Sequence, residues 1–206
     1  MEGKQAHNRH REVAFVEMVL ERSERELVEA CQRGERDAFR ALFEAHKDRV
    51  YSIALRFSGD EALAMDLAQD TFLKLFSCIR EFRGDSAFST WVYRLVVNSC
   101  LDHKRRSWRL IPIADELFAV LRAPGDSLHA MLETEMRDRV RAAVEKLTPD
   151  LRMVTVLRYT EGLSYDQISE VLGCSTGTVA SRLNRAHKAL ERRLAHFVST
   201  QGARHV

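Results

Sequence analysis

The 206-residue sequence has few helix breakers and no long hydrophobic run. Only three prolines and nine glycines interrupt it, and no stretch alternates polar and apolar residues as a half-buried strand does. No apolar run approaches the roughly 18 residues needed to cross a bilayer. The first residues lack the apolar core and small-residue cleavage site of a signal peptide. We therefore expect an all-α, cytoplasmic protein with no membrane insertion.

The sequence also lacks the patterns of a metal site or an enzyme. Its four cysteines, Cys31, Cys78, Cys100 and Cys174, are far apart, which disfavours both a disulfide framework and a cysteine-rich zinc site and predicts buried free thiols. Cys100 and His103 supply only two ligands, too few for zinc. No glycine-rich phosphate loop, paired carboxylates or activated nucleophile is found. We expect no enzymatic activity, no catalytic residue, no metal and no cofactor.

A large net charge is absent too, but the charges are segregated along the chain. The formal net charge of +2 argues against a protein that coats nucleic acid by charge alone. Residues 91–110 carry five bases against one acid, whereas residues 60–77 carry four acids against one base. Residues 112–140 have six acids against three bases. Separate acidic and basic surfaces indicate more than one kind of partner.

Residues 162–194 have the pattern of a helix-turn-helix. Ser164 and Gln167 form a capping box that begins a helix at Tyr165, and Gly173 suits its end. Ser175 then caps a second helix with an apolar stripe on one face. The opposite, polar face contains Thr178, Ser181, Arg182, Asn184, Arg185 and Lys188. This face could enter a DNA major groove, although the same geometry also occurs as plain helical packing.

The first 80 residues contain three more predicted helices. Ser23 and Glu26 form a capping box for a short helix that stops near Gly34, and a longer helix with a core histidine, His46, ends near residues 58–60. The third covers residues 61–79. Its predicted buried stripe is Ala64, Ala68, Phe72, Leu75, Phe76 and Ile79, and its outer face carries Asp66, Gln69, Asp70 and Lys74. Alone, that face is typical of ordinary solvated helices.

Residues 82–106 combine aromatic and basic side chains. A helix capped by Ser89 or Thr90 is predicted from Trp91 to about Arg106, and it becomes steadily more basic. Aromatic rings interleaved with bases suit single-stranded nucleic acid, because rings stack on bases and cations follow the backbone. For Phe88 and Trp91 taken singly, core packing is the competing interpretation.

The chain divides into two helical domains. Pro112, Pro124 and Gly125 interrupt the helical pattern at residues 110–126, which predicts a flexible acidic linker. Ser127 caps a helix that ends at Thr148 and Pro149, and another helix leads to residue 159. We predict an N-terminal extension at 1–22, a helical domain at 23–109, the linker at 110–126, a helix-turn-helix domain at 127–198 and a tail at 199–206.

The two halves of the chain together resemble a known family. In the first half, the resemblance rests on DLAQDTFLKLF followed by FSTWVYRLVVNSCLDHKRRSWR. In the second half, it rests on LRMVTVLRYTEGLSYDQISEVLGCSTGTVASRLNRAHKAL. The chain looks like a bacterial extracytoplasmic-function sigma factor of RNA polymerase, of the sigma-70 family. The resemblance covers about residues 25–195. It implies promoter-specific transcription initiation, with core RNA polymerase, promoter DNA and a cognate anti-sigma factor as partners.

The resemblance also assigns roles to individual residues. The polymerase-binding face would be Asp66, Gln69 and Asp70. Recognition and melting of the minus-ten element would involve Phe88, Trp91, Asn98, Asp102, Arg105 and Arg106. The linker would thread the polymerase cleft. The minus-thirty-five element would be read by Ser175, Thr178, Ser181, Arg182, Arg185 and Lys188.

Three positions depart from the family's pattern, and two other functions remain open. Asp70 stands where the family more often has Glu, Ala180 where Lys is common, and His187 where Arg is frequent. The changes at positions 180 and 187 bear on promoter preference. One alternative is a helix-turn-helix regulator with an N-terminal signal-receiving domain. The other is an all-helical adaptor without DNA contact. Neither alternative needs the FSTWVYR and KRR segments.

Overall fold

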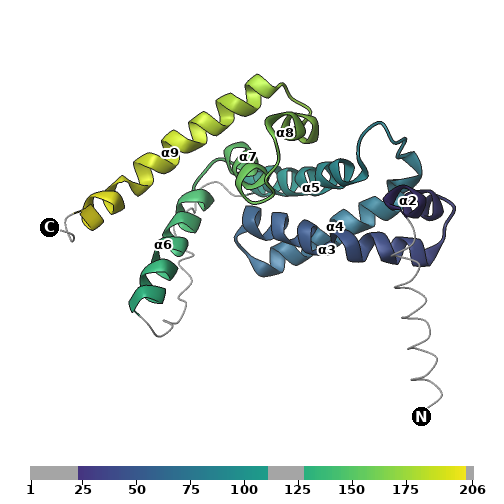
Figure 1. Cartoon of the computed structure of the whole chain (residues 1–206), viewed down its shortest axis with the longest axis horizontal. Coiled ribbons are helices and arrows are strands. Elements are labelled where there is room, and N and C mark those ends of the chain that lie inside the picture. The colour runs from purple at the N-terminus through teal and green to yellow at the C-terminus, as the bar shows by residue number, and fades with distance from the viewer. Residues whose placement is uncertain (1–22, 111–127, 203–206) are drawn as a thin grey trace, which may run out of the picture. The chain divides into compact units, whose positions relative to one another are not determined.

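The computed structural model describes residues 23–110 and 128–202, and every regular element within these ranges is a helix (Figure 1). The predicted all-α class is therefore confirmed. No helix among the described residues is long and apolar enough to cross a membrane. The elements are α2 (Glu24–Gln32), α3 (Arg36–Ser58), α4 (Glu61–Cys78), η1 (Ile79–Glu81), α5 (Phe88–Leu110), α6 (Leu128–Glu145), α7 (Pro149–Tyr159), α8 (Tyr165–Leu172) and α9 (Thr176–Gly202).

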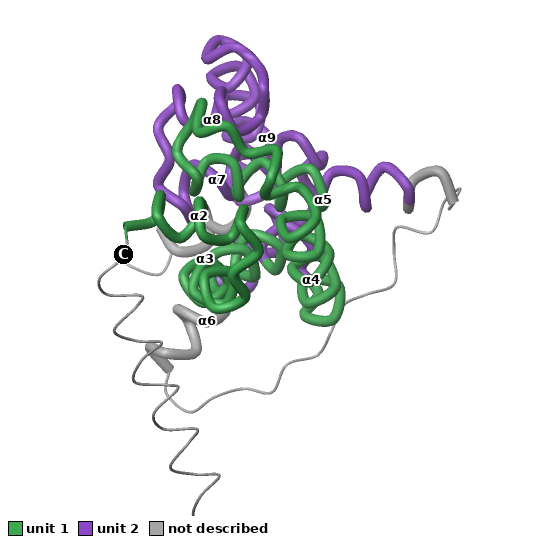
Figure 2. The backbone as a smooth tube through the Cα atoms, turned by 90° about the vertical axis from the view of Figure 1, so that its right-hand side faces the viewer, with its two compact units in different colours: residues 1–55, 60–99 green, residues 56–59, 100–206 purple. Residues whose placement is uncertain are grey.

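The chain forms two compact units (Figure 2). Unit 1 comprises residues 1–55 and 60–99, and unit 2 comprises residues 56–59 and 100–206. The boundary falls within α5, at residue 99, about ten residues before the boundary that we predicted. Most of the predicted linker, at 111–127, lies outside the described residues, as do the extension at 1–22 and the end of the tail at 203–206.

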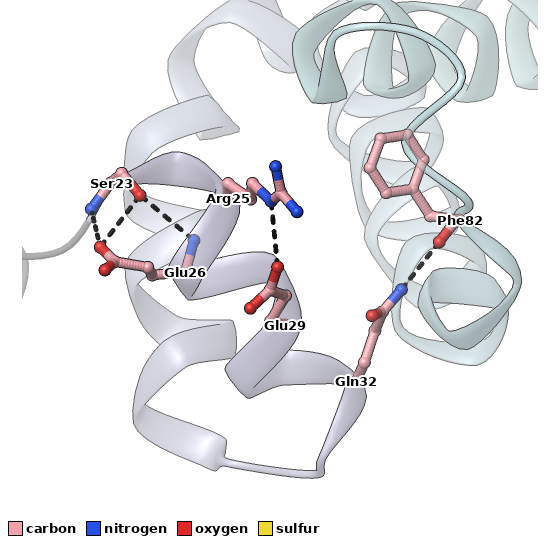
Figure 3. A network of polar contacts seen from close by, with 6 residues as sticks. All are labelled: Ser23, Arg25, Glu26, Glu29, Gln32 and Phe82. Carbon is pink, nitrogen blue, oxygen red and sulfur yellow. Dashed lines mark hydrogen bonds and ion pairs between the residues drawn. The ribbon is translucent and has the colours of Figure 1, made fainter.

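Helix α2 begins at the predicted capping box (Figure 3). The Ser23 hydroxyl accepts a hydrogen bond from the Glu26 amide at 3.4 Å, and the Ser23 amide donates to the Glu26 carboxylate at 2.7 Å. Two otherwise unsatisfied amides of the first turn are thus paired. After the last turn, Gly34 adopts φ 92°, a conformation that side chains disfavour. Local chemistry alone accounts for both ends of α2.

Helices α3 and α4 pack through their aromatic residues. The Phe43 and Phe72 ring centroids lie 4.6 Å apart, and the Phe39 and Phe76 centroids 5.0 Å apart, both edge to face. Such pairs stabilise the contact beyond simple burial. The prediction that Phe76 is buried is wrong, because this side chain is 64% exposed. The buried face of α4 instead includes Leu67 and Thr71.

Helix α5 begins at Phe88, three residues before the predicted start. The Trp91 amide already donates to the Ala87 carbonyl at 3.2 Å, so Ser89 and Thr90 lie inside the first turn and cap nothing. Phe88 is only 4% exposed. Because its ring is anchored in the core, tertiary packing extends the helix beyond the caps that the sequence offers.

In unit 2, α7 and α8 both pack against α9. Ser164 and Gln167 form the predicted capping box, and Gly173 ends α8 in the left-handed conformation with φ 61°. The Ser175 hydroxyl accepts from the Thr178 amide at 3.2 Å, which caps α9 as predicted. Buried residues from α8 and α9 form the core between them: Ile168, Val171, Val179, Leu183 and Ala186. The helix-turn-helix geometry is therefore confirmed.

Candidate nucleic-acid and protein interfaces

The polar face of α4 is exposed as predicted. Asp66, Gln69 and Asp70 are all exposed, and steps of three and one residue place them on one side of the helix. Lys74, one turn after Asp70, is also exposed, but its ammonium donates to the Ser99 hydroxyl of α5 at 3.0 Å. The face is therefore acidic, and Asp60 fixes the start of its helix by accepting from the Leu63 amide at 2.7 Å.

Three aromatic rings cluster where the loop after η1 meets α5. The Phe82 ring centroid lies 5.4 Å from that of Phe88 and 5.2 Å from that of Trp91, and the Phe88 and Trp91 centroids are 5.6 Å apart. Trp91 is half-buried, whereas Phe88 is buried beside His46. Phe88 is a core side chain here, and its contact with nucleic acid stays a prediction. The Phe88 ring packs against Trp91 on the core side of the cluster.

Gln32, which the sequence did not single out, holds this loop. Its side-chain amide donates to the carbonyl of Phe82 at 2.8 Å, fifty positions away in the sequence (Figure 3). The same amide donates to the carbonyl of Ile79 at 3.0 Å. Both carbonyls lie in the segment between α4 and α5. One side chain of α2 thus fixes the backbone that carries Phe82. No spacing rule connects positions so far apart, so only the structure reveals this role.

The polar side of α5 carries the other residues predicted to contact the minus-ten element. Asn98, Arg105 and Arg106 are exposed, and Asp102 is half-buried. Arg105 lies 3.3 Å from Asp102 in an i, i+3 ion pair, with 70% and 49% of the two side chains exposed. Such surface pairs contribute at most about 1 kcal/mol. Arg105 can therefore exchange Asp102 for a phosphate at little cost.

The predicted DNA-reading face of α9 contains two different arginines. Arg185 is exposed and donates to the Ser181 carbonyl at 3.4 Å. Arg182 is 25% exposed, and its guanidinium lies 3.5 Å from the carboxylate of Asp150 at the beginning of α7. Ser175, Ser181 and Lys188 are exposed, and Thr178 is half-buried. The six predicted residues thus share one side of the helix start, but Asp150 partly neutralises Arg182.

A second contact on α9 was not predicted. The Tyr159 hydroxyl lies 2.6 Å from Nε2 of His187, although the two residues are 28 positions apart. The Tyr159 side chain is 62% exposed. Tyr159 therefore orients the imidazole that stands where the family often has Arg. Within the described residues, this contact ties the end of α7 to the middle of α9.

Two buried titratable groups lie in unit 1. His46 is 6% exposed, and its Nε2 lies 3.2 Å from the Glu24 carboxylate in an orientation that does not complete a hydrogen bond. Burial lowers the pKa of His46 below its usual value, and the charge of Glu24 opposes this shift. Burial also raises the pKa of the Cys31 thiol to about 11. These groups belong to the core. In the part of the chain described, no cluster of three His, Cys, Asp or Glu could hold a metal.

Comparison with known proteins identifies the family. The model of sigma-70 region 2 matches residues 42–110, and that of sigma-70 region 4 matches residues 137–190. The RNA polymerase sigma-H factor of Pseudomonas aeruginosa is 36% identical over 186 residues, which are 86% of this chain and 96% of that protein. The chain belongs to the sigma-70 family. It is an extracytoplasmic-function sigma factor, as the resemblance implied.

Other relatives agree with this assignment. The ECF RNA polymerase sigma-E factor of Escherichia coli strain K12 is 34% identical over 183 residues, covering 84% of this sigma factor and 94% of its relative. The structure of CnrH in complex with the cytosolic domain of CnrY matches with a TM-score of 0.62 at 26% identity, covering 84% and 97% of the two chains. RpoE from Bartonella quintana, in complex with the anti-sigma factor NepR, has the same fold, with a TM-score of 0.60 at 24% identity and coverage of 76% and 96%.

Proposed function

We propose that this sigma factor binds core RNA polymerase through the acidic face of α4 and reads promoter DNA through α5 and α9. Sigma factors bring polymerase to promoters and are not themselves enzymes. We accordingly assign the protein to the cytoplasm, with residues 23–109 as the polymerase-binding and minus-ten domain, 110–126 as linker and 127–198 as the minus-thirty-five domain. An anti-sigma factor is a further proposed partner.

One observation supports the proposal. Each unit presents a charged face within the residues that match its sigma-70 region, the acidic face of α4 in region 2 and the basic face of α9 in region 4. Asp66, Gln69 and Asp70 lie within the region 2 match and project from a helix whose own base is tied to Ser99. Arg185 and Lys188 lie within the region 4 match and are exposed. An acidic face repels DNA phosphates and suits a basic protein surface, whereas a basic helix face suits DNA.

The α5 surface suits an opened DNA strand. Trp91 is half-buried, so one part of its ring rests on Phe82 and Phe88 while the rest remains accessible. A fixed ring is a better stacking platform than a mobile one, since less side-chain freedom is lost when a base stacks. Asn98 offers both a donor and an acceptor to a base edge. Phe88 takes the supporting role in place of the base contact that the resemblance implied.

The polymerase assignment is tested by charge reversal on α4. Asp66→Arg with Asp70→Arg is expected to weaken binding to core polymerase by more than tenfold in a fluorescence titration. The fold should survive, because exposed substitutions usually change stability by within about 0.5 kcal/mol. Glu61→Arg, an exposed acid on the same helix but away from this face, is the matched control and is expected to bind normally. Equal affinity of all three proteins would exclude the α4 face as the binding surface.

A further inference from the structure

An apolar groove of about 660 Å³ runs between α3 and α4. Its lining includes Phe39, Phe43, Met65, Phe72, Leu73 and Phe76. Met65, Leu73 and Phe76 are at least 60% exposed. Contiguous apolar surface of this kind marks a place where another segment packs. We therefore expect a segment with its own apolar stripe to pack in the groove.

The groove adjoins the proposed polymerase-binding face. Gln69 belongs to both, because it lines the groove and lies between Asp66 and Asp70 on α4. Asp48 adds a carboxylate from the α3 side. The base in the lining, Lys47, already pairs with Glu44 at 2.5 Å. An occupant should therefore combine an apolar stripe with bases that face an acidic rim.

The first 22 residues of this chain have that composition. Apolar residues recur at Val13, Val16, Val19 and Leu20, a spacing that places them on one side of a helix. The preceding residues 1–11 contain three bases, Lys4, Arg9 and Arg11, against the single acid Glu2, whereas residues 12–22 contain three acids against the single base Arg22. These residues lie outside the described part of the chain. The apolar stripe of residues 13–20 suits the floor of the groove, and the bases of residues 4–11 suit its acidic rim.

The described chain begins against α3, one of the two helices that form the groove. Glu24, in the first turn of α2, lies 3.2 Å from Nε2 of His46 on α3. His46 is adjacent in sequence to Lys47 and three residues from Phe43, and both of these line the groove. Helical residues rise 1.5 Å each, so the α3 lining from 39 to 51 spans about 18 Å and residues 12–22 would span about 16 Å. The segment is long enough to lie along the groove.

We infer that residues 12–20 dock in the α3–α4 groove of the same chain and that residues 4–11 lie against Asp66 and Asp70. The segment then covers part of the face proposed to bind polymerase, and the two compete. Docking is independent of the proposed function, whereas competition rests on it. The docked N-terminal segment thereby inhibits holoenzyme assembly.

Photo-crosslinking of the full chain tests the docking step. The photoreactive amino acid p-benzoylphenylalanine replaces Leu73 in the groove or, as a control, Ala45, which is exposed on α3 outside the lining. Trypsin cuts after Arg11 and Arg22, so the segment is released as the single peptide EVAFVEMVLER. Irradiation is expected to join this peptide to position 73 and not to position 45. The absence of this product from position 73 overturns the inference.

Isotope labelling distinguishes the same chain from a second copy. Equal amounts of ¹⁵N-labelled and unlabelled protein are mixed before irradiation. Docking within one chain gives crosslinked peptides that are wholly labelled or wholly unlabelled. Peptides of mixed label would instead show that the groove is an interface between copies, and would overturn the inference.

Competition is tested in the full chain with Val16→Asp and Val19→Asp together. Apparent affinity is proportional to the fraction of molecules whose binding face is free, so release of a segment that covers this face in nine molecules of ten tightens core-polymerase binding about tenfold. Ala14→Asp with Met18→Asp, which adds the same charge off the apolar stripe, should leave affinity unchanged. Equal affinity of both double variants and wild type for core polymerase would overturn the inference that the segment competes with polymerase. If wild-type protein and both double variants all fail to bind core polymerase, the proposed function itself fails, and the crosslink still decides docking.

Discussion

Arg182 of the helix predicted to read the minus-thirty-five element lies 3.5 Å from the carboxylate of Asp150 at the beginning of α7. This ion pair distinguishes Arg182 from Arg185, although the two arginines are equivalent in the sequence pattern. Arg182 is oriented and partly neutralised before any DNA arrives, and Arg185 is exposed. A partner charge must be displaced or shared before Arg182 can contact a phosphate or a base.

We therefore expect Arg185→Ala to weaken binding to a selected upstream element more than Arg182→Ala does. Loss of a base-reading arginine costs roughly 1–3 kcal/mol and relaxes the sequence preference. Fluorescence anisotropy at several salt concentrations measures both effects, since loss of a phosphate contact lowers the salt slope instead. Asp150→Asn is the matched control. It should free Arg182, steepen the salt slope and tighten non-specific binding, whereas identical behaviour of the two alanine variants would contradict the distinction.

Promoter opening is expected to depend on Trp91 and Asn98. Capture of an unstacked base costs a few kcal/mol, which a small domain hardly supplies alone, so opening requires polymerase to hold the duplex. Holoenzyme with Trp91→Ala or Asn98→Ala should show reduced permanganate reactivity of promoter thymines and retain protection of the upstream element. The free protein should bind duplex promoter weakly. Normal opening by both variants would leave Trp91 as a packing residue and Asn98 as ordinary helix surface.

Phe88 is expected to contribute more to the folding stability of the protein than to DNA binding. Its buried ring contacts Phe82, Trp91 and His46, and truncation of a buried Phe to Ala typically costs about 3–5 kcal/mol. Urea denaturation of Phe88→Ala should show this loss, and Phe88→Leu, which retains most of the volume, a smaller one. Trp91→Ala, at the half-buried edge of the cluster, should lose less than Phe88→Ala. The reverse order would place Phe88 at the surface.

His46 should make unfolding pH-dependent. Because burial lowers its pKa in the folded state, the unfolded chain binds more protons as the pH falls below about 6.5, the usual value for histidine. Stability therefore falls with pH from about 6.5 down to the lowered folded pKa. Urea denaturation between about pH 5 and pH 8 should show this slope in wild type and in His103→Leu, an exposed-histidine control. His46→Leu should flatten it, and an unchanged slope would contradict the assignment.

Much of the fold followed from local signals. The capping boxes at Ser23 and Ser164 appear where the sequence placed them, because an N-cap hydroxyl and the residue three positions later satisfy each other's backbone without help from the rest of the chain. Gly173 ends α8 for a similarly local reason. The exposure of Asp66 and Asp70 also followed from helical periodicity.

Tertiary packing decided what periodicity could not. Phe76 satisfies the spacing of a buried stripe and is nevertheless exposed beside the α3–α4 groove, because a face is buried only where another helix covers it. Phe88 begins α5 earlier than any capping residue indicates, since its ring has a place in the core.

The sequence by itself determined the all-helical class, the caps at Ser23, Ser164 and Ser175, the two charged faces and the family. Only the tertiary structure joined Asp150 to Arg182, Tyr159 to His187 and Gln32 to the carbonyl of Phe82. Hydrogen bonding within a helix acts over three or four residues, so sequence spacing reports it directly. These other contacts join residues 28 to 50 positions apart, and they exist only once the helices have packed.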